Sequence, residues 1–173
     1  TPVTPELIAE IKPAHVIVAT GAHAAAPSVE GADASKVCTF EDVLSGKVAP
    51  TGNVVVLGGG MYGCEATQAL IEKGIKPVVL EKGPMMAMDA GWIRGFNLML
   101  NIPMAGVRCV TNTKEVKVTA ADVTFTAVNK EKQEFTETVP YDTLIVAEKP
   151  VATPFEAIEA KCKELSIPTH VIG

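Results

Sequence analysis

The stretch NVVVLGGGMYG at residues 53–63 decides the fold. Its first five residues form a short apolar run rich in β-branched side chains, which is typical of a buried strand. Three glycines follow at the spacing G-x-G-x-x-G, and residues 64–73, closed by Gly74, predict a helix. A second apolar strand is expected at residues 77–80, where Pro77 is tolerable as the first residue. Together these segments predict a right-handed β-α-β unit.

Each of the three spaced glycines has its own task in such a loop. Gly58 permits the tight turn out of the strand, Gly60 lets the backbone approach a pyrophosphate, and Gly63 allows the helix to pack closely on the strand. A phosphate would lie on the N–H groups at the helix N-terminus, where the helix dipole favours an anion. The residues expected to bind a dinucleotide here are Gly58, Gly59, Gly60, Met61, Tyr62 and Gly63.

Glu81 ends the second strand, about 20 residues after the loop, where a carboxylate accepts hydrogen bonds from a ribose 2′-hydroxyl. A 2′-phosphate placed there would meet like charge, so Glu81 favours NAD(H) over NADP(H). Lys82 is the alternative anchor, because a neighbouring cation could hold a 2′-phosphate, although a solvated surface lysine is the simpler interpretation. A purely structural turn with an incidental Glu81 is the other alternative.

The rest of the chain predicts further strands and helices around this unit. Residues 15–19 form an apolar run that we interpret as a buried strand, and a punctuated connector follows to residue 52. Further elements are expected as a short helix at 39–44, a helix at 93–100, a strand at 107–110, an antiparallel meander at 115–118, 122–128 and 134–139, a buried strand at 144–147, a helix at 154–165 and an apolar end at 170–173. This order predicts an α/β fold.

Composition excludes several classes of protein. The 173 residues are 47% hydrophobic and 20% charged, which excludes a disordered chain. The formal net charge of −5 gives no basic surface for a phosphate backbone, so we expect no nucleic-acid partner. No apolar run reaches the ~20 residues of a membrane span, so no membrane partner is expected either.

The four cysteines predict free thiols in a reducing compartment. They are widely spaced and contain no C-x-x-C pair, which disfavours a zinc site, a dithiol redox site or an iron–sulfur cluster in this chain. We therefore expect a cytoplasmic protein with no metal site, and the four positions are Cys38, Cys64, Cys109 and Cys162.

The order of these segments resembles the pyridine-nucleotide-binding region of the two-dinucleotide flavoprotein reductases. Within that superfamily it most resembles the C-terminal part of NADH:flavin oxidoreductases of the 2,4-dienoyl-CoA reductase and 2-enoate reductase group. The resemblance implies a Rossmann-like three-layer FAD/NAD(P)-binding domain with a parallel sheet, helices and an antiparallel β-meander. The segments that carry it are VIVATG (16–21), VVVLGGGMYGCE (54–65), VVLE (78–81), YDTLIVA (141–147) and VIG (171–173).

The resemblance adds residues that the spacing alone does not predict. Residues Ala19, Thr20 and Gly21 match the A-T-G segment that closes the FAD domain against the NAD domain. Glu65 matches an acidic residue near the nicotinamide end, and its alternative is a first-turn glutamate favoured by the helix dipole. Ala147 opens the segment next to nicotinamide and flavin, where Lys149 stands in place of the usual glycine.

The resemblance also implies how the chain is divided. We expect a remnant of an FAD-domain strand with a connector at 1–52, an NAD(H)-binding domain at 53–147 and a return segment toward the FAD domain at 148–173. The sequence has no glycine-rich FAD loop before Lys12, so it is interpreted as a fragment of a longer flavoprotein. FAD would be held in that parent protein, with FMN and an iron–sulfur cluster elsewhere in it.

The resulting hypothesis is an NADH-dependent flavoprotein oxidoreductase domain that passes a hydride from NADH to FAD, for onward reduction of an enoyl-type substrate in the full-length enzyme. The fragment alone is expected to be inactive, and no catalytic side chain is expected, because nicotinamide and flavin carry the chemistry. The partners would be NADH, the remainder of the parent chain and, in a homo-oligomer, further copies. The alternatives are an S-adenosylmethionine-dependent methyltransferase, which Gly63 and the meander disfavour, and a non-catalytic NADH-sensing module, which Lys149 supports.

Overall fold

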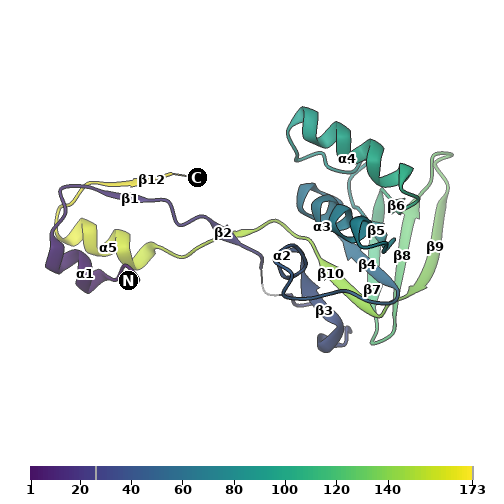
Figure 1. Ribbon diagram of the computed structural model, residues 1–173, viewed down its shortest axis with the longest axis horizontal. Coiled ribbons are helices and arrows are strands. Elements are labelled where there is room, and N and C mark those ends of the chain that lie inside the picture. Colours follow the sequence, from purple (N-terminus) through teal and green to yellow (C-terminus); the bar gives the residue numbers. More distant parts are fainter. Residues whose placement is uncertain (26, 173) are drawn as a thin grey trace. The chain divides into compact units, whose positions relative to one another are not determined.

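The computed structural model describes residues 1–25 and 27–172, which form two compact units (Figure 1). The larger unit is the continuous segment Ala24–Lys149, and the smaller unit joins the residues before it to those after it. Residues 27–52 of the connector therefore pack with the larger unit. Gly173, the last residue of the apolar end expected at 170–173, lies outside the described residues.

The centre of the larger unit is a five-stranded parallel sheet in the order β3-β10-β4-β5-β6. Its strands are β3 (Val37–Thr39), β10 (Thr143–Val146), β4 (Val54–Leu57), β5 (Val78–Leu80) and β6 (Arg108–Val110). They are continuously apolar because both faces are covered, and Val56, Val79 and Ile145 are fully buried. Four of these strands confirm the sequence prediction, and β3 was not predicted.

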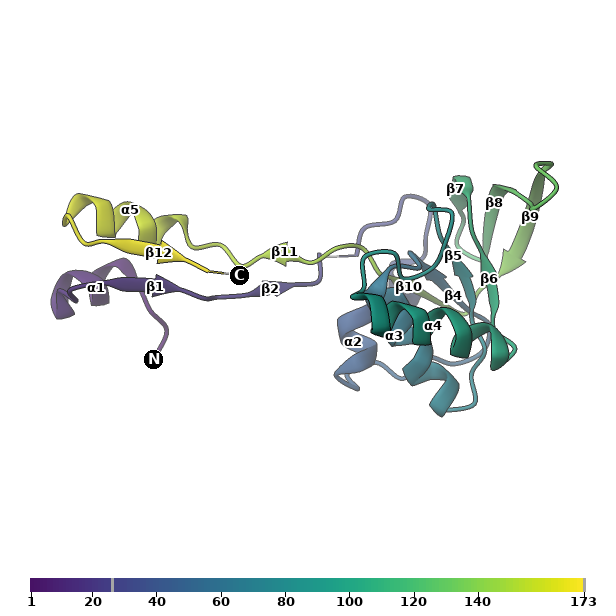
Figure 2. The ribbon, with the colours of Figure 1, turned by 90° about the horizontal axis from the view of Figure 1, so that it is seen from above.

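Helices cover one face of this sheet and a meander covers the other (Figures 1 and 2). The helices are α2 (Phe40–Leu44), α3 (Met61–Glu72) and α4 (Trp92–Met104), and the meander consists of β7 (Thr113–Val118), β8 (Asp122–Val128) and β9 (Glu134–Pro140). One hydrophobic core lies under the helices around Leu70 and Leu98, and the second lies under the meander around Phe125 and Tyr141. The predicted three-layer α/β fold is confirmed.

The meander shows why its strands alternate in sequence. On β8, Val123, Phe125 and Ala127 are fully buried against the sheet, because successive side chains of a strand point to opposite faces. The threonines between them face outward and form hydrogen bonds across to β9, with Oγ1–Oγ1 distances of 2.8 Å for Thr124–Thr138 and 3.0 Å for Thr126–Thr136.

α2 is fixed by a capping box. The Thr39 hydroxyl accepts a hydrogen bond from the Asp42 N–H at 3.1 Å, and the Asp42 carboxylate accepts one from the Thr39 N–H at 3.0 Å. The Asp42 carboxylate also accepts a hydrogen bond from Lys47 at 2.8 Å. These contacts lower the pKa of Asp42 from 3.8 to about 2, and the hydrogen bond from Lys47 contributes most to this shift.

We expect Asp42→Asn to destabilise the protein by about 1 to 2 kcal/mol at neutral pH, a value discounted for the exposure of Lys47. Because the folded pKa is lowered, the stabilisation by Asp42 is present above pH 3.8 and is lost as the pH falls toward 2. Urea unfolding of both proteins at pH 7 and at several values below pH 4 measures this. A stability difference that does not shrink on acidification would contradict the assignment.

Within its described residues, 1–23 and 150–172, the smaller unit contains two pairs of strands and two helices. Its elements are α1 (Pro5–Ile11), β1 (Val16–Val18), β2 (Ala22–His23), β11 (Val151–Ala152), α5 (Glu156–Glu164) and β12 (Thr169–Val171). β1 pairs with β12 in parallel, and β2 pairs with β11 in antiparallel orientation. α1 was not predicted, although its signal is local: the Thr4 hydroxyl accepts from the Leu7 N–H at 3.3 Å, and Pro5 follows at the first helical position.

The burial expected for residues 15–19 is wrong in this structure, and the apolar C-terminal end is exposed as well. Val18 is buried, but Ile17 is 65% exposed and Val171 is 50% exposed. A two-stranded sheet has two faces, and alternate residues point to each of them, so an apolar run does not bury every side chain. Apolar sequence therefore predicts the strands here without predicting their burial.

Candidate functional site

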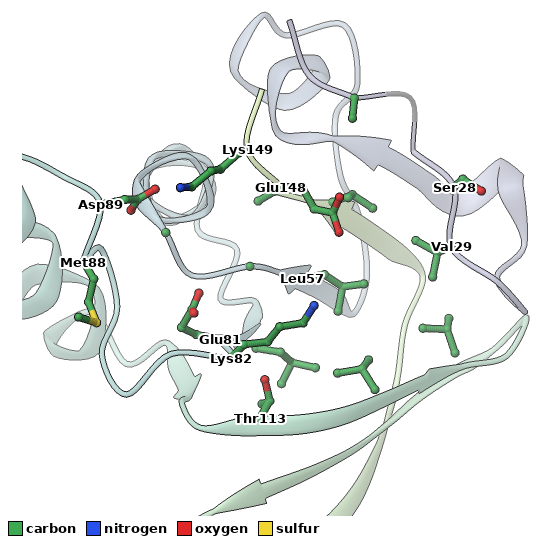
Figure 3. A pocket seen from close by; sticks show the side chains of 18 of the residues that line it. Ser28, Val29, Leu57, Glu81, Lys82, Met88, Asp89, Thr113, Glu148 and Lys149 are labelled. Carbon is green, nitrogen blue, oxygen red and sulfur yellow. The ribbon is translucent and has the colours of Figure 1, made fainter. Parts of the chain in front are cut away.

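A cavity of about 860 Å³ lies in the larger unit where β4, β5 and β10 end (Figure 3). Gly58 follows β4, Glu81 follows β5 and Ala147 follows β10, and all three line the cavity. Because the strands are parallel, their carboxyl ends meet at one edge of the sheet, which is where open α/β sheets bind ligands. Part of β7, including Thr113 and Val116, closes the cavity from the meander side.

At two positions of the glycine loop, a Cβ would collide with backbone atoms. A Cβ on Gly63 would lie 1.9 Å from the Gly58 carbonyl oxygen, which is the close approach of helix to strand that the spacing predicts. Gly58 has a φ of +101°, and a Cβ there would lie 2.7 Å from the Ala147 carbonyl oxygen. The glycine loop therefore packs directly against the end of β10.

Glu81 joins the loop to the turn after β5. One carboxylate oxygen accepts a hydrogen bond from the Gly59 N–H at 2.6 Å, and the other accepts one from the Gly83 N–H at 2.6 Å. A carboxylate has about four acceptor positions, so these two bonds leave capacity for further donors from the cavity side. Glu81 thus fixes the loop and remains able to accept hydroxyl groups.

The N-terminus of α3 is bound by a carboxylate that sequence reasoning missed. The Met61 N–H donates to Asp89 at 2.6 Å, and Asp89 also lines the cavity. The segment that carries Asp89 is held on the loop by a 2.7 Å hydrogen bond from the Ala87 N–H to the Gly59 carbonyl oxygen. Asp89 lies 28 positions after Met61, so no local spacing indicated the contact.

Two lysines and four acids line the cavity. Lys82 extends its amino group across the cavity toward Leu57, and the amino group of Lys149 points toward Asp89 (Figure 3). The acids are Glu30, Glu81, Asp89 and Glu148. Lys149, which replaces the glycine expected from the resemblance, therefore supplies a positive charge beside the N-terminus of α3.

Not all predicted site residues face this cavity. Glu65 is bound in a two-point ion pair by Arg94 of α4, at 2.7 and 2.5 Å, and this hydrogen bonding raises the pKa of Arg94. Tyr62 packs on Phe40 of α2, with ring centroids 4.7 Å apart. Gly59 and Gly63 are buried and do not line the cavity. The residues Ala19, Thr20 and Gly21 belong to the smaller unit.

The cysteines of the larger unit are free thiols. Burial raises the pKa of Cys64 to about 12 and that of Cys38 to about 11, so both remain protonated at neutral pH. The Cys64 thiol donates to the Gly59 carbonyl oxygen at 3.2 Å, beneath the loop. Among residues 1–25 and 27–172, no cluster of three or more His, Cys, Asp or Glu side chains could hold a metal ion. Within the same residues, no helix has both the length and the apolar character needed to cross a membrane.

The fold and the cavity together define a class of protein. A parallel sheet, a glycine loop that opens a helix and an acid at the end of the next strand are the features of a dinucleotide-binding α/β domain. Residues 7–166 match the pyridine nucleotide-disulphide oxidoreductase family, and the chain belongs to this family. The resemblance to flavoprotein reductases is thereby confirmed, and the methyltransferase alternative is wrong.

Curated relatives of the chain are longer proteins. It is 36% identical over 135 residues to NADH oxidase from Thermoanaerobacter brockii, which covers 75% of this chain and 20% of that protein. It is 31% identical over 163 residues to bilirubin reductase from Mediterraneibacter gnavus (strain CC55_001C), which covers 93% of this chain and 25% of that protein. The chain therefore spans about a quarter or less of these two relatives' length.

Solved structures share the fold over the whole chain. A 2-naphthoyl-CoA reductase complex superposes with a TM-score of 0.78 at 24% identity, covering 100% of this chain and 26% of that one. Histamine dehydrogenase from Rhizobium sp. 4-9 gives a TM-score of 0.77 at 16% identity, covering 100% of this chain and 29% of that one. At these identities the likeness supports the fold alone.

Proposed function

We propose that residues 53–147, with residues 27–52 packed around them, form the NAD(H)-binding domain of a flavin-dependent oxidoreductase. The observation that carries this proposal is Glu81, whose carboxylate is fixed by the glycine loop while its remaining acceptor positions face an 860 Å³ cavity. The family membership and the relatives named NADH oxidase and bilirubin reductase support an NADH-dependent redox role.

The residues present fit a dinucleotide in one orientation. Glu81 would accept the hydroxyls of the adenosine ribose, the N-terminus of α3 would hold the pyrophosphate, and Ala147 with the segment after it would lie toward the nicotinamide. Bound NADH supplies the hydride. The protein's part is to bind and orient it, with Lys82 and Lys149 supplying positive charge along the cavity.

The larger reaction belongs to the parent protein. We propose that the hydride passes to FAD, with Ala19, Thr20 and Gly21 of the smaller unit on the FAD side, and that an enoyl-type substrate is the final acceptor. FMN and an iron–sulfur cluster would lie outside this chain. A cytoplasmic location is proposed from the four free cysteines, since thiols stay reduced there. Assembly into a homo-oligomer stays a prediction.

We expect NADH to bind at least about tenfold more tightly than NADPH, because the 2′-phosphate would meet the negative charge of Glu81. Titrations of the chain followed by nicotinamide fluorescence, with calorimetry as a second readout, measure both dissociation constants. Lys82→Ala serves as the control and should leave the preference for NADH in place. A preference for NADPH that disappears in Lys82→Ala would instead assign the 2′-phosphate to Lys82.

The absence of NADH binding at millimolar cofactor would end the proposal. The NADH-sensing alternative is separated by a different measurement, namely NADH-dependent reduction of flavin in the parent protein. Tight NADH binding without any flavin reduction would favour the sensor, whereas reduction at a steady rate supports the oxidoreductase.

A further inference from the structure

Asp89 lies at the site that the proposed function assigns to the pyrophosphate of NADH. The Met61 N–H is the first of α3, and it donates to the Asp89 carboxylate at 2.6 Å. Asp89 also lies against Gly60, one residue earlier, since a Cβ added there would lie 2.9 and 3.0 Å from the two Asp89 carboxylate oxygens. A carboxylate of this chain thus occupies the helix N-terminus that would receive the pyrophosphate.

The carboxylate and a pyrophosphate are mutually exclusive occupants. A dinucleotide pyrophosphate carries two negative charges, whereas the helix N-terminus offers only about half a positive charge. Like charges in one site raise each other's free energy. Lys149, whose amino group points toward Asp89, can balance one anion at this place but not both groups together (Figure 3).

We propose that the Asp89 carboxylate occupies the pyrophosphate site in the free protein. It must leave the N-terminus of α3 before NADH binds, and it thereby sets the affinity for the cofactor. The inference rests on the proposed function and adds a residue that controls it. In this scheme Lys149 faces Asp89 in the free protein and the pyrophosphate in the complex.

The segment around Asp89 is built for such a local movement. Met86 and Ala87 are buried, and the Ala87 N–H is bonded to the Gly59 carbonyl oxygen, so they anchor the segment on the loop. Asp89 itself is exposed, and Gly91, two residues later, is the N-cap of α4. The carboxylate can therefore turn into water without breaking the anchor, and the cost of its departure appears as a weaker apparent affinity.

The direct test compares NADH binding by the wild type and by Asp89→Asn. The amide keeps an oxygen that can accept from the Met61 N–H but removes the charge, so we expect NADH to bind about tenfold more tightly, equivalent to about 1.4 kcal/mol. Glu72→Gln is the matched control, because Glu72 is an exposed acid at the other end of α3. It removes the same charge from the chain and should leave the affinity unchanged.

Two further measurements separate this role from a purely structural one. ADP-ribose, which contains the pyrophosphate, should gain affinity in Asp89→Asn as NADH does, whereas adenosine, which lacks it, should not. The unliganded variant should lose about 2 to 4 °C in Tm, because a carboxylate at a helix N-terminus stabilises the helix. Lower stability with tighter binding is the signature of an anion that competes with the cofactor.

Unchanged or weaker NADH binding by Asp89→Asn would overturn the inference, and so would an equal gain in Glu72→Gln or for adenosine. These results leave the proposed function intact as long as the wild type binds NADH. If neither the wild type nor Asp89→Asn binds NADH, the proposed function fails and the role of Asp89 fails with it.

Discussion

Replacing Glu81 with alanine should lower the affinity for NADH by about 100-fold, because two hydrogen bonds from a ribose to a carboxylate are worth about 1.5 kcal/mol or more each. The same change removes the acceptor of the Gly59 N–H, which is buried, and of the Gly83 N–H. We expect this to lower the free energy of unfolding by about 2 kcal/mol. Fluorescence titration with NADH and urea unfolding measure the two effects.

Glu148→Gln is the control for Glu81. Glu148 lines the same cavity, but its side chain is exposed, so its loss should change the affinity much less and leave the stability nearly unchanged. Glu81→Gln adds a second comparison: it removes the charge that disfavours a 2′-phosphate, and the preference for NADH over NADPH should narrow. If Glu81→Ala bound NADH as tightly as the wild type, the Glu81 carboxylate would only stabilise the loop and the turn and would not bind the cofactor.

The part of the site that sequence could predict is the part built from consecutive residues. The loop from Gly58 to Gly63 and the acid at the end of the next strand follow from local spacing, because each element of a β-α-β unit begins where the previous one ends. Asp89 could not be found in this way. It reaches Met61 from 28 residues away, through a segment whose path is set by the buried Met86 and Ala87.

The same distinction explains the differences in the fold. Strands with a strong apolar run were predicted. β3 has only three residues between a 3-10 turn and α2, and its apolar run is too short to predict a strand. β3 joins the sheet through parallel pairing with β10, more than 100 residues later. Short strands of this kind depend on tertiary pairing more than on their own sequence. The burial of Ile17 was overestimated for a related reason. An apolar run in the sequence shows that a strand is apolar, but it does not show whether another element covers that strand.

The largest effect on the fold is expected for Gly63→Ala. The added Cβ would lie 1.9 Å from the Gly58 carbonyl oxygen, and that contact is with backbone that cannot rotate away. Either α3 must move off β4 or the loop must change its path, and overpacking of this severity costs about 3 kcal/mol or more. We expect the Tm to fall by about 10 °C and NADH binding to weaken with it, because the same loop forms the cofactor site.

Gly91→Ala is the matched control for Gly63→Ala. A Cβ on Gly91 would meet no atom within 4 Å, and its φ of −57° suits any residue. This substitution at the start of α4 should cost less than about 1 kcal/mol. Thermal and urea unfolding of the two variants, together with one NADH titration of each, complete the comparison. Equal stabilities would mean that α3 can shift on β4 without loss, and the close approach at Gly63 would then not be what holds the glycine loop in place.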